Sequence, residues 1–220
     1  ILAFLTRTVF IYLLGSTYLG VNGLYTEILS LLSFAELGFG SAMTFALYKP
    51  VAENDSDKII KLLGFYKKVY RIVAGIIALL GICLLPFLPK IVKGADWLTV
   101  RELRNYFIIF LINTVVGYFV TYKFSYLNAL QKNYINTNID TIVNSICYCA
   151  QVLVILATKN FLLYLLVNSA ILVVSRFFIA KYLNRKYPIL KAKPEVPLLK
   201  EEKKQIFNEV KGLIVHQFSS

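Results

Sequence analysis

Acidic side chains and residues that commonly bind metals are scarce in this chain. It has 12 Asp and Glu against 24 Lys and Arg, and a single histidine, His216. No further ligand stands at metal-binding spacing from His216, so the sequence predicts no metal site. A glycine-rich phosphate loop of the G-x-x-x-x-G-K-[ST] type is absent, and Ser219 and Ser220 have no base arrangement nearby. The sequence therefore predicts no enzyme, no cofactor and no ATP-driven machine.

The three cysteines, Cys83, Cys147 and Cys149, all fall inside apolar runs. Because Cys147 and Cys149 are two residues apart, they would point to nearly opposite sides of a helix. The cysteines are therefore predicted to be small buried residues and not a disulfide or a metal site. No basic start, short apolar stretch and small-residue cleavage site follow one another, so no signal peptide is predicted.

What the chain has in abundance is apolar length. Hydrophobic residues make up 58% of the 220 residues, charged residues only 16%, and the mean hydropathy is +0.65. The apolar residues form long runs, and a hydrocarbon core of about 30 Å needs roughly 20 residues of helix. The sequence thus predicts an all-α membrane protein with a six-helix transmembrane bundle. The predicted runs are 1–14, 24–47, 72–88, 106–126, 141–158 and 161–180, and a seventh opens near Ile206.

The formal net charge is +12, and most Lys and Arg lie between the apolar runs. This distribution indicates membrane topology and not a nucleic-acid partner, because excess Lys and Arg remain on the cytoplasmic side. Basic residues follow the second, fourth and sixth runs, whereas residues 15–23 carry no charge. We therefore predict a multi-pass protein of the plasma membrane with a cytoplasmic N-terminus and residues 15–23 outside.

Two segments between the runs have features of their own. Residues 57–71 mix Ile and Leu with lysines and are predicted to form an amphipathic helix on the membrane surface. Residues 187–202 hold three prolines among lysines, as in a linker. The predicted organisation is a six-helix unit at 1–186, a cytoplasmic basic linker at 187–205 and the start of a seventh helix at 206–220. Both ends fall in apolar stretches, so we expect a fragment of a longer membrane protein.

Two opposite charges, Arg7 and Glu36, lie inside apolar runs. At 1.5 Å per residue, they would lie roughly 12 Å and roughly 18 Å below the outer surface. Ionisable groups at such depth are costly and usually face a partner or a water-filled cavity. Two readings stay open: a structural ion pair that locks two helices, or a transport cavity with Arg7 available to an anion. Ser33 shares the predicted face of Glu36.

A weaker polar stripe is predicted on the fifth helix. Asn144, Cys147, Tyr148 and Gln151 follow the i, i+3, i+4, i+7 spacing of one helix face. Asn113 lies inside the fourth run, and Asn168 lies inside the sixth. Such amides either join helices by hydrogen bonds or line a hydrated cavity, and the sequence leaves both possibilities open.

Several motifs resemble a known family. They are TRTVFIY at 6–12, YLGVNGL at 18–24, ILSLLSFAELGFGSA at 28–42, LYKP at 47–50 and FYKKVYR at 65–71. In these residues the chain resembles the polysaccharide-type (Wzx-like) flippases of the multidrug/oligosaccharidyl-lipid/polysaccharide exporter superfamily. The likeness is strongest over 6–71 and continues more loosely to about residue 204.

The resemblance implies two six-helix bundles around a central cavity that opens alternately to each side of the membrane. This chain would supply the first bundle, and the second six-helix half is missing from it. The implied substrate is an oligosaccharide on an undecaprenyl diphosphate carrier, moved across the bacterial cytoplasmic membrane. Membrane lipid and a coupling cation, Na⁺ or H⁺, are further implied partners. The candidate cavity residues are Arg7, Ser33, Glu36, Asn113, Asn144 and Gln151.

The resemblance gives roles to two of these residues. Arg7 would attract the diphosphate, because Arg offers bidentate donors to phosphate. Glu36 would set the orientation of the substrate or couple transport to the cation. A cation-coupled drug or metabolite exporter of the same superfamily, and a non-transporting membrane scaffold of polysaccharide assembly, are the alternatives.

Overall fold

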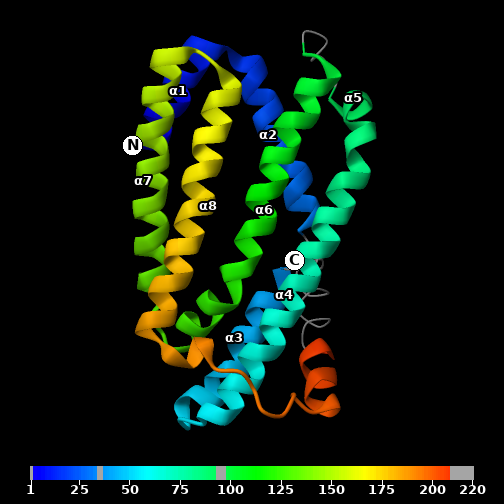
Figure 1. Cartoon of the computed structure of the whole chain (residues 1–220), viewed down its shortest axis with the longest axis vertical. Coiled ribbons are helices and arrows are strands. Elements are labelled where there is room, and N and C mark those ends of the chain that lie inside the picture. Colours follow the sequence, from blue (N-terminus) through cyan, green and yellow to red (C-terminus); the bar gives the residue numbers. More distant parts are fainter. Residues whose placement is uncertain (1, 34–36, 93–97, 209–220) are drawn as a thin grey trace, which may run out of the picture. The chain divides into compact units, whose positions relative to one another are not determined.

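Gly15 divides the first apolar segment of the chain into two helices (Figure 1). The computed structural model describes residues 2–33, 37–92 and 98–208. Helix α1 spans Leu2–Leu14 and helix α2 spans Ser16–Leu32. Between them Gly15 has a φ of 89°, which a residue without a Cβ adopts readily. The Gly15 amide still donates to the Ile11 carbonyl at 3.0 Å and so closes the last turn of α1.

Helix α3 spans Leu37–Ala52 and helix α4 spans Ser56–Leu84. Asn54, with a φ of 56°, occupies the turn between them. The Asp55 carboxylate accepts a hydrogen bond from the Lys58 amide at 3.0 Å and so caps the start of α4. After α4, Pro86 and Pro89 coincide with a 3₁₀ turn at Leu85–Phe87 and the four-residue helix α5 at Leu88–Ile91.

Helix α6, Val100–Ala129, begins with reciprocal capping. The Thr99 amide donates to the Glu102 carboxylate at 2.9 Å, and the Glu102 amide donates to the Thr99 hydroxyl at 3.2 Å. Helices α7, Asn133–Thr158, and α8, Phe161–Lys186, follow, and the Asn160 side chain caps α8 by accepting from the Leu163 amide. A 3₁₀ turn at Pro188–Lys191 comes next, and residues 200–208 are again helical.

The prediction of an all-helical chain is confirmed for the described residues, which contain no strand. Within the ranges that the structure describes, four helical segments are long and apolar enough to cross a membrane, and this indicates a membrane protein. They are Ser56–Ile91, Val100–Ala129, Asn133–Thr158 and Phe161–Lys186. The predicted number of six helices is wrong, because the described parts of the chain form the eight α-helices α1–α8 besides the helical residues 200–208.

The extra helices have local causes. The run 24–47 is divided, since α2 ends at Leu32, Ser33 is in a turn and α3 begins at Leu37. The prolines after α4 separate the short helix α5. Residues 16–23, predicted as an outside connection, belong to α2. The stretch 57–71, predicted as a short amphipathic surface helix, is helical but continuous with the apolar part of α4. Apolar composition alone therefore does not show where one helix ends or where two predicted segments form one continuous helix.

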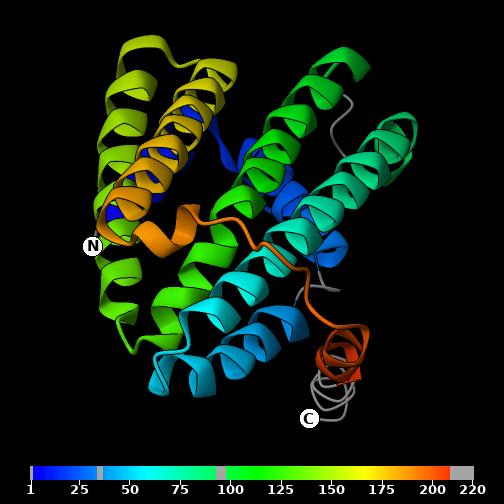
Figure 2. The same cartoon turned by 60° about the horizontal axis from the view of Figure 1, so that its bottom comes forward.

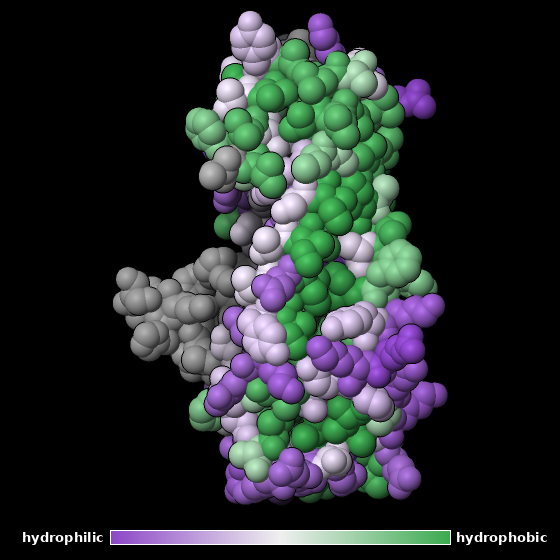
Figure 3. All heavy atoms as spheres, turned by 90° about the vertical axis from the view of Figure 1, so that its left-hand side faces the viewer, coloured by the Kyte–Doolittle hydropathy of each residue, from purple (hydrophilic) through white to green (hydrophobic). Residues whose placement is uncertain are grey.

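The chain divides into two compact units, and α4, α6, α7 and α8 each contribute residues to both. Unit 1 comprises Ile1–Leu32, Ile76–Gly117 and Ile139–Arg176, and unit 2 comprises Ser33–Gly75, Tyr118–Asn138 and Phe177–Ser220. In unit 1, α7 and α8 run side by side in both ribbon views (Figures 1 and 2). Their outer residues are apolar, and Figure 3 shows hydrophobic side chains over the side of α7, as lipid contact requires. The exposed apolar residues of this face include Ile142, Ile146, Leu153, Leu156, Leu163, Leu166 and Val174.

Aromatic rings form much of the core of unit 1. Phe161 contacts Phe10 at 5.8 Å, Tyr18 at 4.6 Å and Tyr106 at 4.9 Å between ring centroids. Tyr25 is fully buried and donates its hydroxyl to the Leu103 carbonyl at 3.0 Å. These contacts join α1, α2, α6 and α8 within the unit.

Candidate functional site

The polar stripe of α7 lies on the wall of a cavity in unit 1. Asn144, Cys147, Tyr148 and Gln151 all line this cavity, which has a volume of about 310 Å³. A helix turns 100° per residue, so the spacing of these four residues places them on one face. Gln151 is only 6% exposed, whereas Asn144 is exposed. The stripe therefore reaches from the accessible part of the cavity to its buried wall.

Three other helices complete the lining, and their contribution is also mostly polar. From α2, α6 and α8 come Asn22, Thr26, Phe110, Asn113, Tyr164, Leu165, Asn168 and Leu172. The lining thus contains four asparagines and one glutamine, and none of the described lining residues is charged. Each carboxamide offers two donor hydrogens and an acceptor oxygen. Such a wall suits a ligand rich in hydroxyl or amide groups and free of charge at this point.

One amide of the cavity also joins two helices. The Ser169 hydroxyl of α8 donates to the Asn113 side-chain oxygen of α6 at 2.7 Å. This bond fixes the orientation of the Asn113 amide, so its nitrogen is the group that can donate elsewhere. Helix-joining and cavity-lining, which the sequence left as alternatives for Asn113, are both compatible with this geometry.

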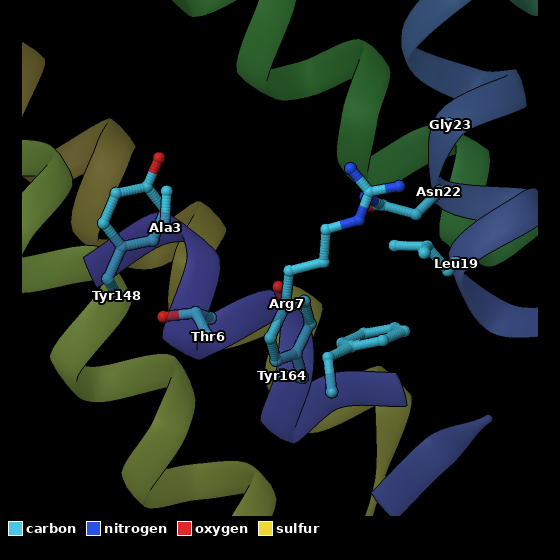
Figure 4. A pocket seen from close by; sticks show the side chains of 9 residues that line it. Ala3, Thr6, Arg7, Leu19, Asn22, Gly23, Tyr148 and Tyr164 are labelled. Carbon is cyan, nitrogen blue, oxygen red and sulfur yellow. The ribbon is translucent and has the colours of Figure 1, made fainter. Parts of the chain in front are cut away.

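Arg7 belongs to an adjoining cavity of about 340 Å³ in the same unit. Asn22, Tyr148 and Tyr164 line both cavities, so the two are neighbours with a shared wall. In Figure 4 the Arg7 side chain extends from α1 toward Asn22 of α2. Arg7 is the one charged residue in the described lining of this cavity. A single cation therefore stands beside a wall of neutral amides.

The packing of the aromatic core next to Arg7 fixes the position of this residue. Phe10, three residues further along α1, is buried and contacts the rings of Phe161 at 5.8 Å and Tyr164 at 5.1 Å. Residues three apart on a helix lie on neighbouring positions of its surface. The packing of Phe10 thus fixes α1 against α8 and so determines where Arg7 emerges.

Of the remaining predicted site residues, Ser33 lines neither cavity and is half-buried in unit 2. Glu36 lies outside the described residues. The Arg7–Glu36 ion pair consequently stays a prediction. Within the described ranges, no carboxylate lies within ion-pair distance of Arg7. Arg7, Asn113, Asn144 and Gln151 are all in unit 1.

Sequence reasoning missed Asn22, Thr26 and Tyr164 as lining residues. Asn22 and Thr26 are four residues apart and so share a face of α2, but Asn22 fell in a stretch predicted to be an outside loop. The absence of charge in residues 15–23 was a signal compatible with helix as well as with an external turn. Tyr164 gives no polar signal of its own within the apolar start of α8.

Comparisons with protein families, with curated proteins and with solved structures find no match for this chain.

Proposed function

We propose that this chain is the cavity-forming part of a bacterial membrane flippase. In this role it moves undecaprenyl-diphosphate-linked oligosaccharides across the cytoplasmic membrane by alternating access, for surface polysaccharide synthesis. The observation that carries the proposal is the pair of adjoining cavities in unit 1: one is lined by five neutral carboxamides, and the other holds one arginine. Both are built from apolar helices, and three of these contribute to segments long enough to span a bilayer.

The carboxamide cavity supports a saccharide ligand. Sugar hydroxyls both donate and accept hydrogen bonds, and Asn and Gln side chains offer both functions in one group. Phe110, Tyr148 and Tyr164 add aromatic faces and edges to the wall, against which the apolar face of a sugar ring can pack. A neutral wall also leaves no charge without a partner when the sugar departs.

Arg7 supports the diphosphate end of the ligand. A guanidinium binds phosphate oxygens through two parallel N–H donors, and this contact strengthens where water is excluded. With Arg7 in the adjoining cavity, one substrate can place its diphosphate there and its sugars against the amides. The lipid tail would remain in the bilayer.

The exporter alternative requires a different cavity. Cationic drugs are held by carboxylates, and the described lining of both cavities contains none. Glu36, the residue that would couple an exporter to Na⁺ or H⁺, lies outside the described residues. The chemistry of the described cavities therefore favours the flippase over the exporter, and the scaffold alternative is tested by the presence or absence of transport.

The test is translocation by the full-length protein in liposomes that contain a fluorescent lipid-linked oligosaccharide. Arg7→Ala is expected to reduce the translocation rate at least about tenfold, which corresponds to about 1.4 kcal/mol of lost diphosphate stabilisation. Arg7→Lys, which keeps the charge but not the planar fork, should retain an intermediate rate. Gln151→Leu should slow translocation while leaving binding of a sugar-free diphosphate lipid unchanged.

Arg101→Ala is the matched control, because Arg101 is exposed and lines neither cavity. Wild-type translocation by Arg7→Ala would reject the role of Arg7. Absence of translocation by the wild-type protein, with intact folding, would favour the scaffold and reject the flippase.

A further inference from the structure

Five basic side chains of unit 2 lie close enough to one another for their charges to interact. They are Lys67 and Arg71 of α4, Lys123 of α6, and Lys191 and Lys193 after α8. The positive charge of Lys123 is repelled by those of Lys67 and Lys191, and that of Lys67 by Arg71 and Lys193. We call these five residues the basic cluster. A folded protein holds like charges together only at a cost, unless an anion lies among them.

Lys123 is the buried member of the basic cluster. Lys123 is only 3% exposed. Its ammonium group donates hydrogen bonds to the Ala180 carbonyl at 3.2 Å and to the Asn184 side-chain oxygen at 2.5 Å. Both acceptors are on α8 and neither is charged. Lys123 is therefore held in place by neutral groups, and its charge is not neutralised by them.

The chain after α8 carries the next two cations over α4. Tyr187 packs against Tyr126 of α6 with ring centroids 6.1 Å apart, and Pro194 lies against Gly64 of α4, where an added Cβ would be 2.8 Å from the proline ring. In Figure 2 this segment crosses α4 on its way to the last helical residues. We call residues 187–194 the strap. Because Lys193 precedes Pro194, the strap places Lys193 near the α4 turn that bears Lys67, and it brings Lys191 within electrostatic range of Lys123.

The acidic residues near the start of α4 are engaged with other lysines. Glu202 accepts a hydrogen bond from Lys58, and Asp57 accepts one from Lys61 at 2.5 Å. Asp55 caps α4 by accepting from the Lys58 amide. The partners of these three carboxylates all lie in the first turns of α4. None of the three therefore neutralises the charge of the basic cluster.

From this placement we infer that the basic cluster is a binding site for a phosphate group, with Lys123 at its base and Lys67, Arg71, Lys191 and Lys193 around its rim. Basic pockets between membrane helices bind the phosphates of anionic lipid headgroups. The basic loops of the sequence predict that this end of the helices is cytoplasmic, where anionic lipid is available. A free phosphate offers the same chemistry, and the experiment separates the two sources.

The test is direct binding to purified full-length protein in detergent, with native mass spectrometry as the readout. The probes are phosphatidylglycerol, phosphatidylcholine and inorganic phosphate. The variant combines Lys67→Gln, Lys191→Gln and Lys193→Gln, because these residues are exposed and leave buried Lys123 in place. Each lost lysine near an anionic headgroup weakens binding, so the variant should bind phosphatidylglycerol at least about tenfold more weakly.

The control combines Lys49→Gln, Lys159→Gln and Lys200→Gln, which changes the net charge equally at exposed positions outside the basic cluster. It should change the dissociation constant less than about twofold. Preference for phosphatidylglycerol that survives millimolar phosphate supports a lipid headgroup, and displacement by phosphate supports a soluble anion. Equal affinity of wild type and variant for every probe, or equal loss in variant and control, would overturn the site.

Discussion

Unit 1 and unit 2 differ in the kind of polar group that they bury. Among the described residues, the buried polar side chains of unit 1, Thr6 and Gln151, are neutral, whereas unit 2 buries the charged Lys123 in addition to the neutral Ser125 and Asn136. Arg7, the cation in the cavity that adjoins the carboxamide-lined one, is exposed. A neutral amide can release a ligand without leaving a desolvated charge, whereas a cation cluster keeps an anion in place. The difference accords with the two proposals, which place passage of a ligand in unit 1 and retention of an anion in unit 2.

The units also differ in how their parts are held together. Unit 1 depends on a cluster of aromatic rings around Phe161, and unit 2 uses the strap across α4 together with the Lys58–Glu202 pair. Core aromatics give large, non-directional stabilisation, whereas the pair is partly exposed and weak. The expected effects of substitution therefore fall in that order.

The largest expected effect is at Phe161. Phe161→Ala should lower the free energy of unfolding by about 3–5 kcal/mol, because it removes a ring that is 3% exposed and leaves a cavity among its neighbours. Phe178→Ala on the same helix is the control, since Phe178 is 63% exposed and should change stability little. Thermal unfolding in detergent measures both. Equal destabilisation by the two variants would contradict the aromatic core of unit 1.

The next largest effects are expected for substitutions of three glycines of α4, two of which, Gly64 and Gly75, are in unit 2 and one, Gly81, in unit 1. Gly64→Ala should cost about 1–3 kcal/mol, because the new Cβ meets the rigid ring of Pro194 at 2.8 Å. Gly81→Ala should cost less, since its Cβ at 2.5 Å meets the end of the flexible Leu111 side chain. Gly75→Ala in α4 has open space and should be neutral or stabilising, as alanine favours helix. The measurement is the order of the melting temperatures of the three variants. If Gly64→Ala had the highest of the three, the contact between Gly64 and the strap would be contradicted.

A smaller effect is expected for the bond between α6 and α8. Asn113→Ala and Ser169→Ala, alone and together, should give a coupling energy of about 0.6–1.7 kcal/mol, the range for hydrogen bonds between membrane helices. A double-mutant cycle in thermal unfolding measures it. Ser175→Ala is the control, since its hydroxyl donates within α8 to the Leu172 carbonyl. Additive single effects would show that the 2.7 Å contact does not contribute.

The smallest expected effect depends on pH and belongs to unit 2. The hydrogen bond from Lys58 holds the pKa of Glu202 below its ordinary value. A carboxylate with a lowered pKa stabilises the folded state above its unfolded pKa, and this stabilisation is lost as the pH falls through the lowered value. Glu202→Gln should thus be less stable than wild type by about 0–1 kcal/mol at neutral pH, with the difference vanishing in acid.

Thermal unfolding of wild type and Glu202→Gln across the acidic range tests this behaviour. Glu201→Gln, at an exposed neighbouring position, is the control and should show no such convergence. A difference that grows toward low pH would contradict the sign derived from the lowered pKa.

Part of the candidate site could be predicted because its signal is local. The stripe on α7 follows helical spacing, and the structure places all four of its residues on one cavity wall. The end of the long apolar helix near Pro86 could be predicted as well, since proline disrupts a continuing helix. Substrate binding at Arg7, Asn113, Asn144 and Gln151 stays a prediction.

Other features could not be predicted from the sequence, because they depend on distant parts of the chain or on the backbone conformation. Nothing in the apolar run 24–47 marks where α2 ends at Leu32. The partners of Lys123, at Ala180 and Asn184, are 57 and 61 residues away in the sequence. The sequence of the run 106–126 therefore gives no basis for predicting the burial of Lys123.

The sequence by itself determined that this chain is helical and apolar enough to enter a membrane, since hydrophobic length and helical period are properties of neighbouring residues. Only the tertiary structure decided which polar groups meet. Asn22, Asn113 and Gln151 come from three helices that the fold packs around one cavity. The Tyr25–Phe107 ring contact joins α2 to α6, and the Ser169–Asn113 hydrogen bond joins α6 to α8.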